Sequence, residues 1–374
     1  MVRPVLVVTG SWRGVAGVYA LAQSVTICGR SDYFMSTNNF FRVVWHRLTN
    51  PHPDLPGLPE SDEVNTVTAG DGEELCVRTF YSDATTDPSA QSSQVRATVV
   101  FAHGFNLSGE SWFFQVDRLK KEPGLRLIVP DLRGHGRSVG SLEDRALQDL
   151  SIEATSRDIV SIIEELAPEG PLVLVGHSMG VMTMLGSVRM MPEAMRERVK
   201  GMMLLNGAIA TFASAGLTTM LNSMPVRSLR YAWKAMPKGM ERMKDAFEWL
   251  LKPVLASGVY HGQLEEGASA KFDVVDFHAA EIGRTPMATI LGFAEDLEKH
   301  DETDAADYLH DIRGVLMAGE KDDVTPVEQT ETIREMWPGS TSETIPEAGH
   351  MLPVECPEKV NTQLIRLIDE CCPR

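Results

Sequence analysis

A serine set between glycines is the strongest chemical motif in the sequence. Residues Gly176–Gly180 read Gly-His-Ser-Met-Gly, directly after the apolar run Pro171–Val175 and before the amphipathic pattern Val181–Met190. In a sharp turn from a strand to a helix, the glycines leave room for the backbone, and the hydroxyl projects where helix N–H groups favour negative charge. We therefore predict that Ser178 is a nucleophile; the alternative is an ordinary turn with an idle serine.

A serine hydroxyl is a weak nucleophile and needs a base within hydrogen-bonding reach. Of the ten histidines, His350 is the best placed, because it lies between the strand-like run Thr341–Ile345 and a final helical pattern at Pro357–Cys371. Small Ala348 and Gly349 before it allow the loop to fold tightly. We predict that His350 is the general base; the alternative is a histidine on a surface loop.

Two adjacent acids are candidates for orienting that histidine. Asp322 and Asp323 follow the apolar run Val315–Ala318. A carboxylate in this place would hold the imidazole tautomer and stabilise the imidazolium ion. Only one of two neighbouring side chains can point at His350, and the residues alone leave both open.

Two backbone N–H groups are candidates for stabilising an oxyanion. Met179 follows the nucleophile and supplies one. The second is expected in the loop after the apolar run Ala97–Ala102, where we predict Phe105, with Gly104 allowing the backbone to approach closely. His103 precedes the turn glycine, which favours a structural hydrogen-bonding role over that of a catalytic base.

These residues need a scaffold, and from Arg96 onward short apolar runs alternate with helical patterns. Continuous Val, Leu and Ile runs indicate strands buried on both faces, and the alternation implies right-handed crossovers in a parallel sheet. Upstream, Asp71-Gly72 between two β-rich runs is typical of a hairpin. We predict an α/β protein with strands at Asn65–Thr68, Glu74–Tyr81, Ala97–Ala102, Leu125–Val129, Leu172–Val175, Met202–Leu205, Val315–Ala318 and Thr341–Ile345, and with helices at Ser156–Leu166, Val181–Met190, Val327–Trp337 and Pro357–Cys371.

One long block breaks this alternation. Residues 207–310 are mostly helical in pattern and rich in Met, Leu and Ala, and no strand-like run interrupts them. We interpret the block as a helical cap inserted between two core strands. The predicted organisation is an N-terminal extension at 1–62, a core at 63–206 and 311–374, and the cap at 207–310, with cap helices at Thr218–Met224, Arg227–Met236, Met240–Leu251, Ala268–Ala280 and Thr285–Glu298.

We expect neither a cofactor nor a metal ion. The loop Asp131–Ser138 contains Gly-x-Gly but lacks the third glycine and the helix start of a dinucleotide-binding loop, so we predict a rigid loop beside the site. The five cysteines include a vicinal pair, Cys371 and Cys372, and form no C-x-x-C motif. They are typical of free thiols in a reducing compartment.

Charge and the N-terminal segment bear on partners and location. A net charge of −17 opposes binding to nucleic acid, which we do not expect as a partner. The charge-free stretch Gly14–Gly29 is too short to span a bilayer comfortably. We predict a cytoplasmic protein; the alternative is weak membrane association, or export through a signal sequence with a small-x-small site at Ala20–Ala22.

Five ordered motifs resemble those of α/β-hydrolase-fold enzymes, most closely bacterial esterase/lipase-like serine hydrolases with a helical cap. The resemblance extends from Glu63 to the C-terminus and implies a mostly parallel eight-stranded sheet flanked by helices. One departure is Val181, where many members have a glycine. The motifs are His103–Phe105, Asp131–Ser138, Gly176–Gly180, Gly319–Pro326 and Ala348–His350.

The resemblance also assigns the acid. In the family pattern a glycine precedes the acid by three positions and a proline follows it by four, so Gly319 and Pro326 select Asp322, with Asp323 as the fallback. Some relatives carry the acid after the sixth strand instead, a position that falls near Asn206 here, which is not an acid. A serine at the elbow argues against dehalogenase and epoxide-opening chemistry, for which relatives carry aspartate.

The implied activity is cleavage of a carboxylic ester through an acyl-enzyme intermediate. We expect a small-molecule ester or a lipid-like substrate, because methionines offer a deformable apolar surface in the insertion; the alternative is that they only pack the cap against itself. Three other functions stay open: a cofactor-free haloperoxidase or perhydrolase, an acyltransferase or thioesterase, and a non-enzymatic binding module. The methionines are Met220, Met224, Met236, Met240, Met243 and Met287.

Overall fold

The computed structural model describes residues 56–82, 95–140, 149–210, 277–278 and 280–374. The chain divides after Pro51 into two units, and only the second contains described residues. Most of the predicted N-terminal extension therefore lies outside the described residues. So do residues 211–276 of the predicted cap, with all the methionines named above except Met287.

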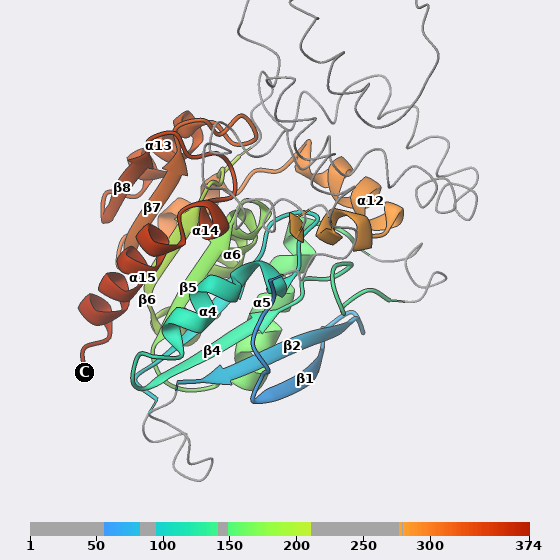
Figure 1. Cartoon of the computed structure of the whole chain (residues 1–374), viewed down its shortest axis with the longest axis horizontal. Coiled ribbons are helices and arrows are strands. Elements are labelled where there is room, and N and C mark those ends of the chain that lie inside the picture. The colour runs from blue at the N-terminus through green and yellow to red at the C-terminus, as the bar shows by residue number, and fades with distance from the viewer. Residues whose placement is uncertain (1–55, 83–94, 141–148, 211–276, 279) are drawn as a thin grey trace, which may run out of the picture. The chain divides into compact units, whose positions relative to one another are not determined.

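A single eight-stranded sheet forms the centre of the described chain (Figure 1). Its strand order is β1-β2-β4-β3-β5-β6-β7-β8; strands β3 to β8 run parallel, and β2 is antiparallel to both β1 and β4. This confirms the predicted α/β class and the mostly parallel sheet. The strands are β1 (Glu63–Thr68), β2 (Glu74–Tyr81), β3 (Ala97–Ala102), β4 (Leu125–Pro130), β5 (Leu172–His177), β6 (Val199–Leu205), β7 (Arg313–Gly319) and β8 (Ser340–Ile345).

Helices cover both faces of this sheet (Figure 1). One face packs against α5 (Ile152–Leu166), α6 (Met179–Met190), α12 (Met287–Leu297) and α13 (Val327–Met336). The opposite face packs against α4 (Phe113–Leu119), α14 (Leu352–Glu355) and α15 (Pro357–Cys371). The remaining short helices are α7 (Glu193–Arg196) and the 3₁₀ helices η2 (Gly109–Trp112) and η4 (Thr303–Tyr308). None of the helices within the described ranges has the length and apolar character needed to cross a membrane.

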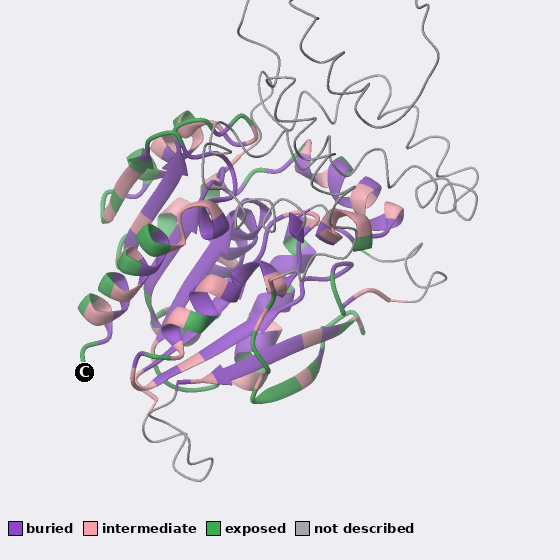
Figure 2. Ribbon diagram, in the orientation of Figure 1, coloured by how far each residue is buried: buried purple, intermediate pink, exposed green. Residues whose placement is uncertain are grey.

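Alternating side chains of the central strands enter the two layers of the core. In β5, Leu172 and Leu174 contact the α5–α6 layer, whereas Val173 and Val175 contact the α4–α15 layer. All four are fully buried, so the strand has no polar face, as expected for a parallel strand covered on both sides. Figure 2 shows the same burial along the neighbouring central strands.

Several elements begin earlier than the sequence pattern predicts. Strand β6 starts at Val199 and β7 at Arg313, three and two residues before the predicted apolar runs. Their first residues include exposed Lys200 and Arg313, which an apolar run does not contain. Helix α5 starts at Ile152, where Ser151 Oγ accepts a hydrogen bond from Ala154 N at 3.1 Å and caps the helix. An apolar-run criterion misses such polar ends.

The strand order reverses between β3 and β5, because the chain passes from β3 outward to β4 and then returns to the other side of β3. The loops that follow β3 and β5 therefore leave the sheet in opposite directions and open a crevice at its carboxyl edge. The predicted oxyanion loop follows β3, and the glycine-flanked serine follows β5. This topology places the two segments side by side.

Two buried histidines join the loops after β3 and β4 through hydrogen bonds. His103 accepts a hydrogen bond from Leu132 N at 2.9 Å through Nε2, and His135 accepts one from Asn106 N at 3.2 Å in the same way. Their Nδ1 atoms lie beside backbone carbonyls of Gly104 and Arg133, so both rings are in the Nδ1–H tautomer. Burial lowers the pKa of His103 to about 4 and that of His135 to about 3. Both therefore stay neutral and act as acceptors, as predicted for His103.

Residues near the two ends of the predicted insertion, 207–310, contact each other beside the sheet. Ala210 forms an isolated antiparallel bridge with Asp301, and Glu302 N donates to Ile209 O at 2.8 Å. Glu302 in turn binds Arg189 of α6 at 2.8 Å. These contacts hold Ala210 and Asp301 together beside the sheet.

A buried ion pair ties the loop after β4 to helix α5. The guanidinium of Arg133 binds both carboxylate oxygens of Asp158, at 2.7 and 2.6 Å, and its third nitrogen reaches Asp71 of the β1–β2 turn at 2.8 Å. Arg133 and Asp158 are each 1% exposed. Burying two charges is favourable only when both are fully paired, so losing one partner is costly.

We predict that Asp158→Ala lowers the free energy of unfolding by about 3–5 kcal/mol, because it leaves the Arg133 guanidinium buried with only Asp71 as a carboxylate partner. Urea denaturation followed by circular dichroism measures the change. The matched control is Glu153→Ala, which removes an exposed partner of Arg157 on the same helix and is expected to cost about 1 kcal/mol or less. A cost below 1 kcal/mol for Asp158→Ala would contradict the assignment.

The buried histidines predict a loss of stability in mild acid. Burial holds their folded pKa values at about 3 or 4, below the usual 6.5, so the unfolded chain binds protons first as the pH falls. Their contribution is therefore complete above pH 6.5 and is lost progressively down to pH 3–4, by as much as about 1.4 kcal/mol per pH unit for each histidine. The group comprises His103, His135, His177, His278 and His300.

Urea unfolding between pH 7 and pH 4.5 tests this dependence. The variant His135→Gln keeps a hydrogen-bond acceptor but does not titrate, so its stability should fall less steeply with pH than that of the wild type. A wild-type unfolding free energy that stays constant from pH 7 to pH 5 would refute the explanation.

Candidate active site

The turn at Ser178 has the strained backbone geometry predicted for a strand-to-helix elbow. Ser178 has φ 55° and ψ −117°, and its backbone is held by Ser178 N donating to Leu205 O at 3.0 Å. A Cβ atom on Gly180 would lie 2.0 Å from Ala102 O, and one on Gly176 would lie 2.5 Å from Gly180 O. Any side chain at either glycine would therefore force the strand and helix apart.

His350 lies against the Ser178 hydroxyl, although 172 residues separate them. Its Nε2 is 2.9 Å from Ser178 Oγ, and the ring is almost completely buried. The loop after β8 reaches this point by packing on the end of β7, where Lys321 N donates to Ala348 O at 2.8 Å. A Cβ on Gly319 would lie 2.1 Å from Gly349 O, so glycine is required there too.

Asp322, and not Asp323, faces the histidine. Asp322 Oδ2 is 2.8 Å from His350 Nδ1, whereas Asp323 is exposed. The other oxygen, Oδ1, accepts hydrogen bonds from Val324 N at 2.8 Å and Thr325 N at 2.9 Å. Burial opposes ionisation, but the charge and hydrogen bond of His350 and the bonds from Thr325 outweigh it, so the pKa of Asp322 lies below its usual value.

Sequence reasoning did not find two further residues that hold this carboxylate. Asn206 follows β6 with φ 47°, and its Nδ2 donates to Asp322 Oδ2 at 2.6 Å and to Gly349 O at 3.2 Å. Thr325 Oγ1 lies 2.8 Å from both Asp322 Oδ2 and Asn206 O. Asn206 lies near the position where the resemblance implies that some relatives carry the acid, but that resemblance gave no role to an amide there.

The loop after β3 lies directly beside the serine. A Cβ on Gly104 would be 3.2 Å from Ser178 Cβ, so the glycine allows this close approach. Within the described part of the chain, no hydrogen bond uses the backbone N–H of Phe105 or of Met179. Both donors are therefore available to an oxygen atom placed near Ser178, and Met179 belongs to the first turn of α6, where N–H groups have no partner within the helix.

An apolar cluster adjoins these residues. It consists of Leu107 from the loop after β3, Phe113, Val354, Met351, which follows His350, and Phe277 from the predicted insertion. The rings of Phe113 and Phe277 meet edge to face at a centroid distance of 5.5 Å. Asn206, Thr325 and Asp322 thus form a polar group on one side of His350, and Met351 connects His350 to the apolar cluster.

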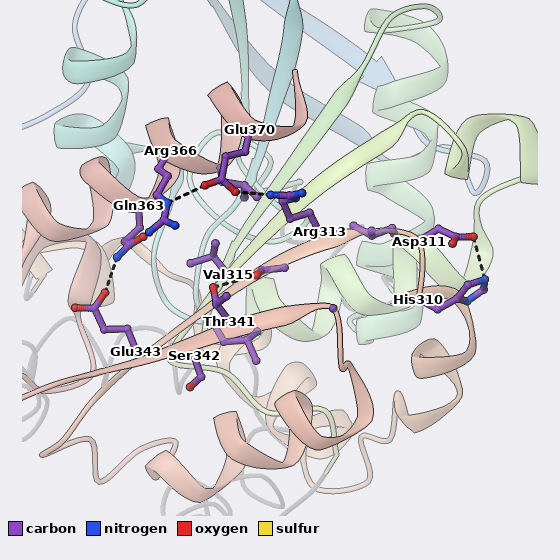
Figure 3. A pocket seen from close by; sticks show the side chains of 15 residues that line it. His310, Asp311, Arg313, Val315, Thr341, Ser342, Glu343, Gln363, Arg366 and Glu370 are labelled. Carbon is purple, nitrogen blue, oxygen red and sulfur yellow. Dashed lines mark hydrogen bonds and ion pairs between the residues drawn. The ribbon is translucent and has the colours of Figure 1, made fainter. Parts of the chain in front are cut away.

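A cavity of about 530 Å³ lies elsewhere, along the opening residues of β7, the edge strand β8 and helix α15 (Figure 3). Its charged side chains already bind one another: Glu370 holds Arg313 and Arg366, and Glu343 accepts from Gln363. Because Asp322 follows the carboxyl end of β7, this cavity belongs to the opposite end of the strand. Among the residues that the structure describes, no group of three or more His, Cys, Asp or Glu could hold a metal ion.

Comparisons with known proteins agree with this architecture. Residues 99–363 match the family described as "Alpha/beta hydrolase family". The chain is 25% identical to Protein ABHD8 of Bos taurus over 277 residues, which are 74% of this chain and 57% of that protein. It therefore spans little more than half the length of this curated relative.

Solved structures share the fold at low sequence identity. A thermophilic esterase from Thermogutta terrifontis has a TM-score of 0.60 and 22% identity, covering 83% of this chain and 99% of its own. A bromoperoxidase from Bacillus anthracis has a TM-score of 0.58 and 16% identity, covering 82% and 100%. At such identities these structures establish the fold alone. The family match covers most of the sheet and all the site residues described above, and this chain belongs to the alpha/beta hydrolase family.

Proposed function

We propose that this protein is a serine hydrolase that cleaves carboxylic esters through an acyl-enzyme intermediate. Membership of the hydrolase family supports the general class. The observation that carries the specific proposal is the unbroken chain of hydrogen bonds from Asp322 to His350 at 2.8 Å and from His350 to Ser178 at 2.9 Å. A hydroxyl, a base and an orienting acid in contact are what nucleophilic catalysis requires.

The geometry supports a defined path for the proton. With Nδ1–H donating to Asp322, Nε2 of His350 is unprotonated and accepts from the Ser178 hydroxyl. As Ser178 Oγ bonds to the ester carbonyl carbon, His350 takes the proton and becomes an imidazolium, which the ionised Asp322 stabilises. His350 then returns the proton to the leaving alcohol. Water, activated by the same nitrogen, releases the acid and regenerates the serine.

The oxyanion formed in each step needs donors that are already in place. We propose the N–H groups of Phe105 and Met179 for this role, because they flank Ser178 and neither is engaged elsewhere in the described chain. Removing one such donor typically costs about 3 kcal/mol of transition-state stabilisation.

The apolar cluster supports an acyl ester or lipid-like substrate. Leu107, Phe277 and Met351 come from three separate segments and meet in one apolar cluster, in which Met351 directly follows His350. We propose that this cluster presents apolar surface to the substrate. Such surface would bind an acyl chain by excluding water from it. We also propose that the substrates are small molecules, since a net charge of −17 opposes binding to nucleic acid.

A fluorophosphonate probe tests the nucleophile. We expect wild-type protein to be labelled and to hydrolyse p-nitrophenyl esters. Ser178→Ala should lose labelling and at least about 10⁴-fold in kcat, because among the described residues Ser178 supplies the only hydroxyl bonded to His350 Nε2. The control is Ser161→Ala on α5, whose hydroxyl binds only Arg157 O. Folded wild type that takes up no probe would contradict the proposal, and halogenation that requires acetate and peroxide would redirect it to a perhydrolase.

The preference for the length of the acyl chain tests the apolar cluster. Phe277→Ala removes a buried ring of this cluster and should lower kcat/KM for hexanoate relative to acetate esters by about tenfold, because the longer chain loses apolar contact worth about 1–3 kcal/mol. Met336→Ala, an exposed change on α13, is the control. An unchanged hexanoate-to-acetate ratio in folded Phe277→Ala would separate this cluster from the substrate.

A further inference from the structure

The side chain of His177, immediately before the nucleophile, points into the protein and not towards solvent. It is 1% exposed, and its Nε2 lies 2.8 Å from the backbone carbonyl oxygen of His350. A carbonyl oxygen only accepts, so Nε2 carries the proton and donates to it. The two imidazole rings are 5.1 Å apart between centroids. The residue next to the nucleophile thus holds the backbone of the base.

The same ring contacts the oxyanion loop. A Cβ on Gly104 would lie 2.9 Å from His177 Nδ1, which means that the Gly104 backbone rests directly on the imidazole. His177 is also part of the Ser178 turn through its own backbone, at the end of β5. One side chain therefore contacts the three segments that carry the nucleophile, the base and the Phe105 N–H.

Its neutrality suits this position. Burial lowers the pKa of His177 to about 3. The neighbouring His350 and His278 lower this pKa further, whereas Asp322 raises it. His177 therefore remains uncharged when His350 takes up the serine proton. A second cation at this distance would disfavour that protonation.

We propose that His177 is a positioning residue, which fixes the His350 backbone through its Nε2–H bond and so sets the distance between His350 Nε2 and Ser178 Oγ. The inference rests on the proposed function, because it concerns the efficiency of the same serine. A displacement of the base by about 1 Å is enough to cost on the order of 100-fold in rate.

Three substitutions separate the hydrogen bond from packing. His177→Phe keeps a planar ring but has no donor, whereas the His177→Gln side chain carries an amide N–H that reaches about as far as Nε2. His177→Asn is one methylene shorter and keeps the polarity without the reach. We expect kcat for p-nitrophenyl acetate, and the rate constant of fluorophosphonate labelling, to fall about 10- to 100-fold in the Phe and Asn variants. KM should change less than threefold, and Gln should recover most of the loss.

His310→Gln, which alters an exposed histidine far along the chain, is the control and should match wild type. Wild-type kcat and labelling rate in folded His177→Phe would overturn the proposal, as would equal losses in Gln and Asn. If His177→Phe does not fold, the comparison of Gln with Asn decides. Failure of the proposed function is a different result, since wild type itself would then take up no probe.

Discussion

The backbone at Ser178 is locked in a conformation that residues with a side chain disfavour, and the rest of the site is arranged around it. Positive φ in such a residue costs about 1–3 kcal/mol and persists only where the surroundings hold it. Here Leu205 O binds the Ser178 N–H, and the close packing of Gly180 on Ala102 leaves the turn no space to relax. The well-packed central sheet supplies the stability that maintains this strain.

Much of this arrangement follows from the sequence, and the remainder depends on tertiary contacts. The strands were predictable because β3 and β5 are unbroken apolar runs, and Ser178, Asp322 and His350 each follow a strand, so the parallel sheet brings them to one edge. Pattern alone could not separate Asp322 from Asp323; that choice needed the family spacing.

Other features had no local signal. The sequence of helix α4, which includes the buried Gln115, lacks a pattern that would distinguish this helix from a loop. Asn206 and His177 became part of the site only because strands β6 and β5 carry them to loops more than 100 residues away. Buried polar side chains must find partners, but the sequence does not say which distant backbone atom supplies one.

The bridge between Ala210 and Asp301 bears on which part of the sequence can change without disturbing the sheet. The bridge joins the chain after β6 to the chain before β7. The pairing of those two strands therefore does not require a particular sequence at residues 211–276. Lengthening a closed segment twofold costs only about 0.6 kcal/mol in chain entropy. Evolution or an engineer can therefore alter residues 211–276 to give new substrate selectivity, while α12, whose Thr289 and Asp296 bind Gly134 O and Ile152 N, stays packed on the core.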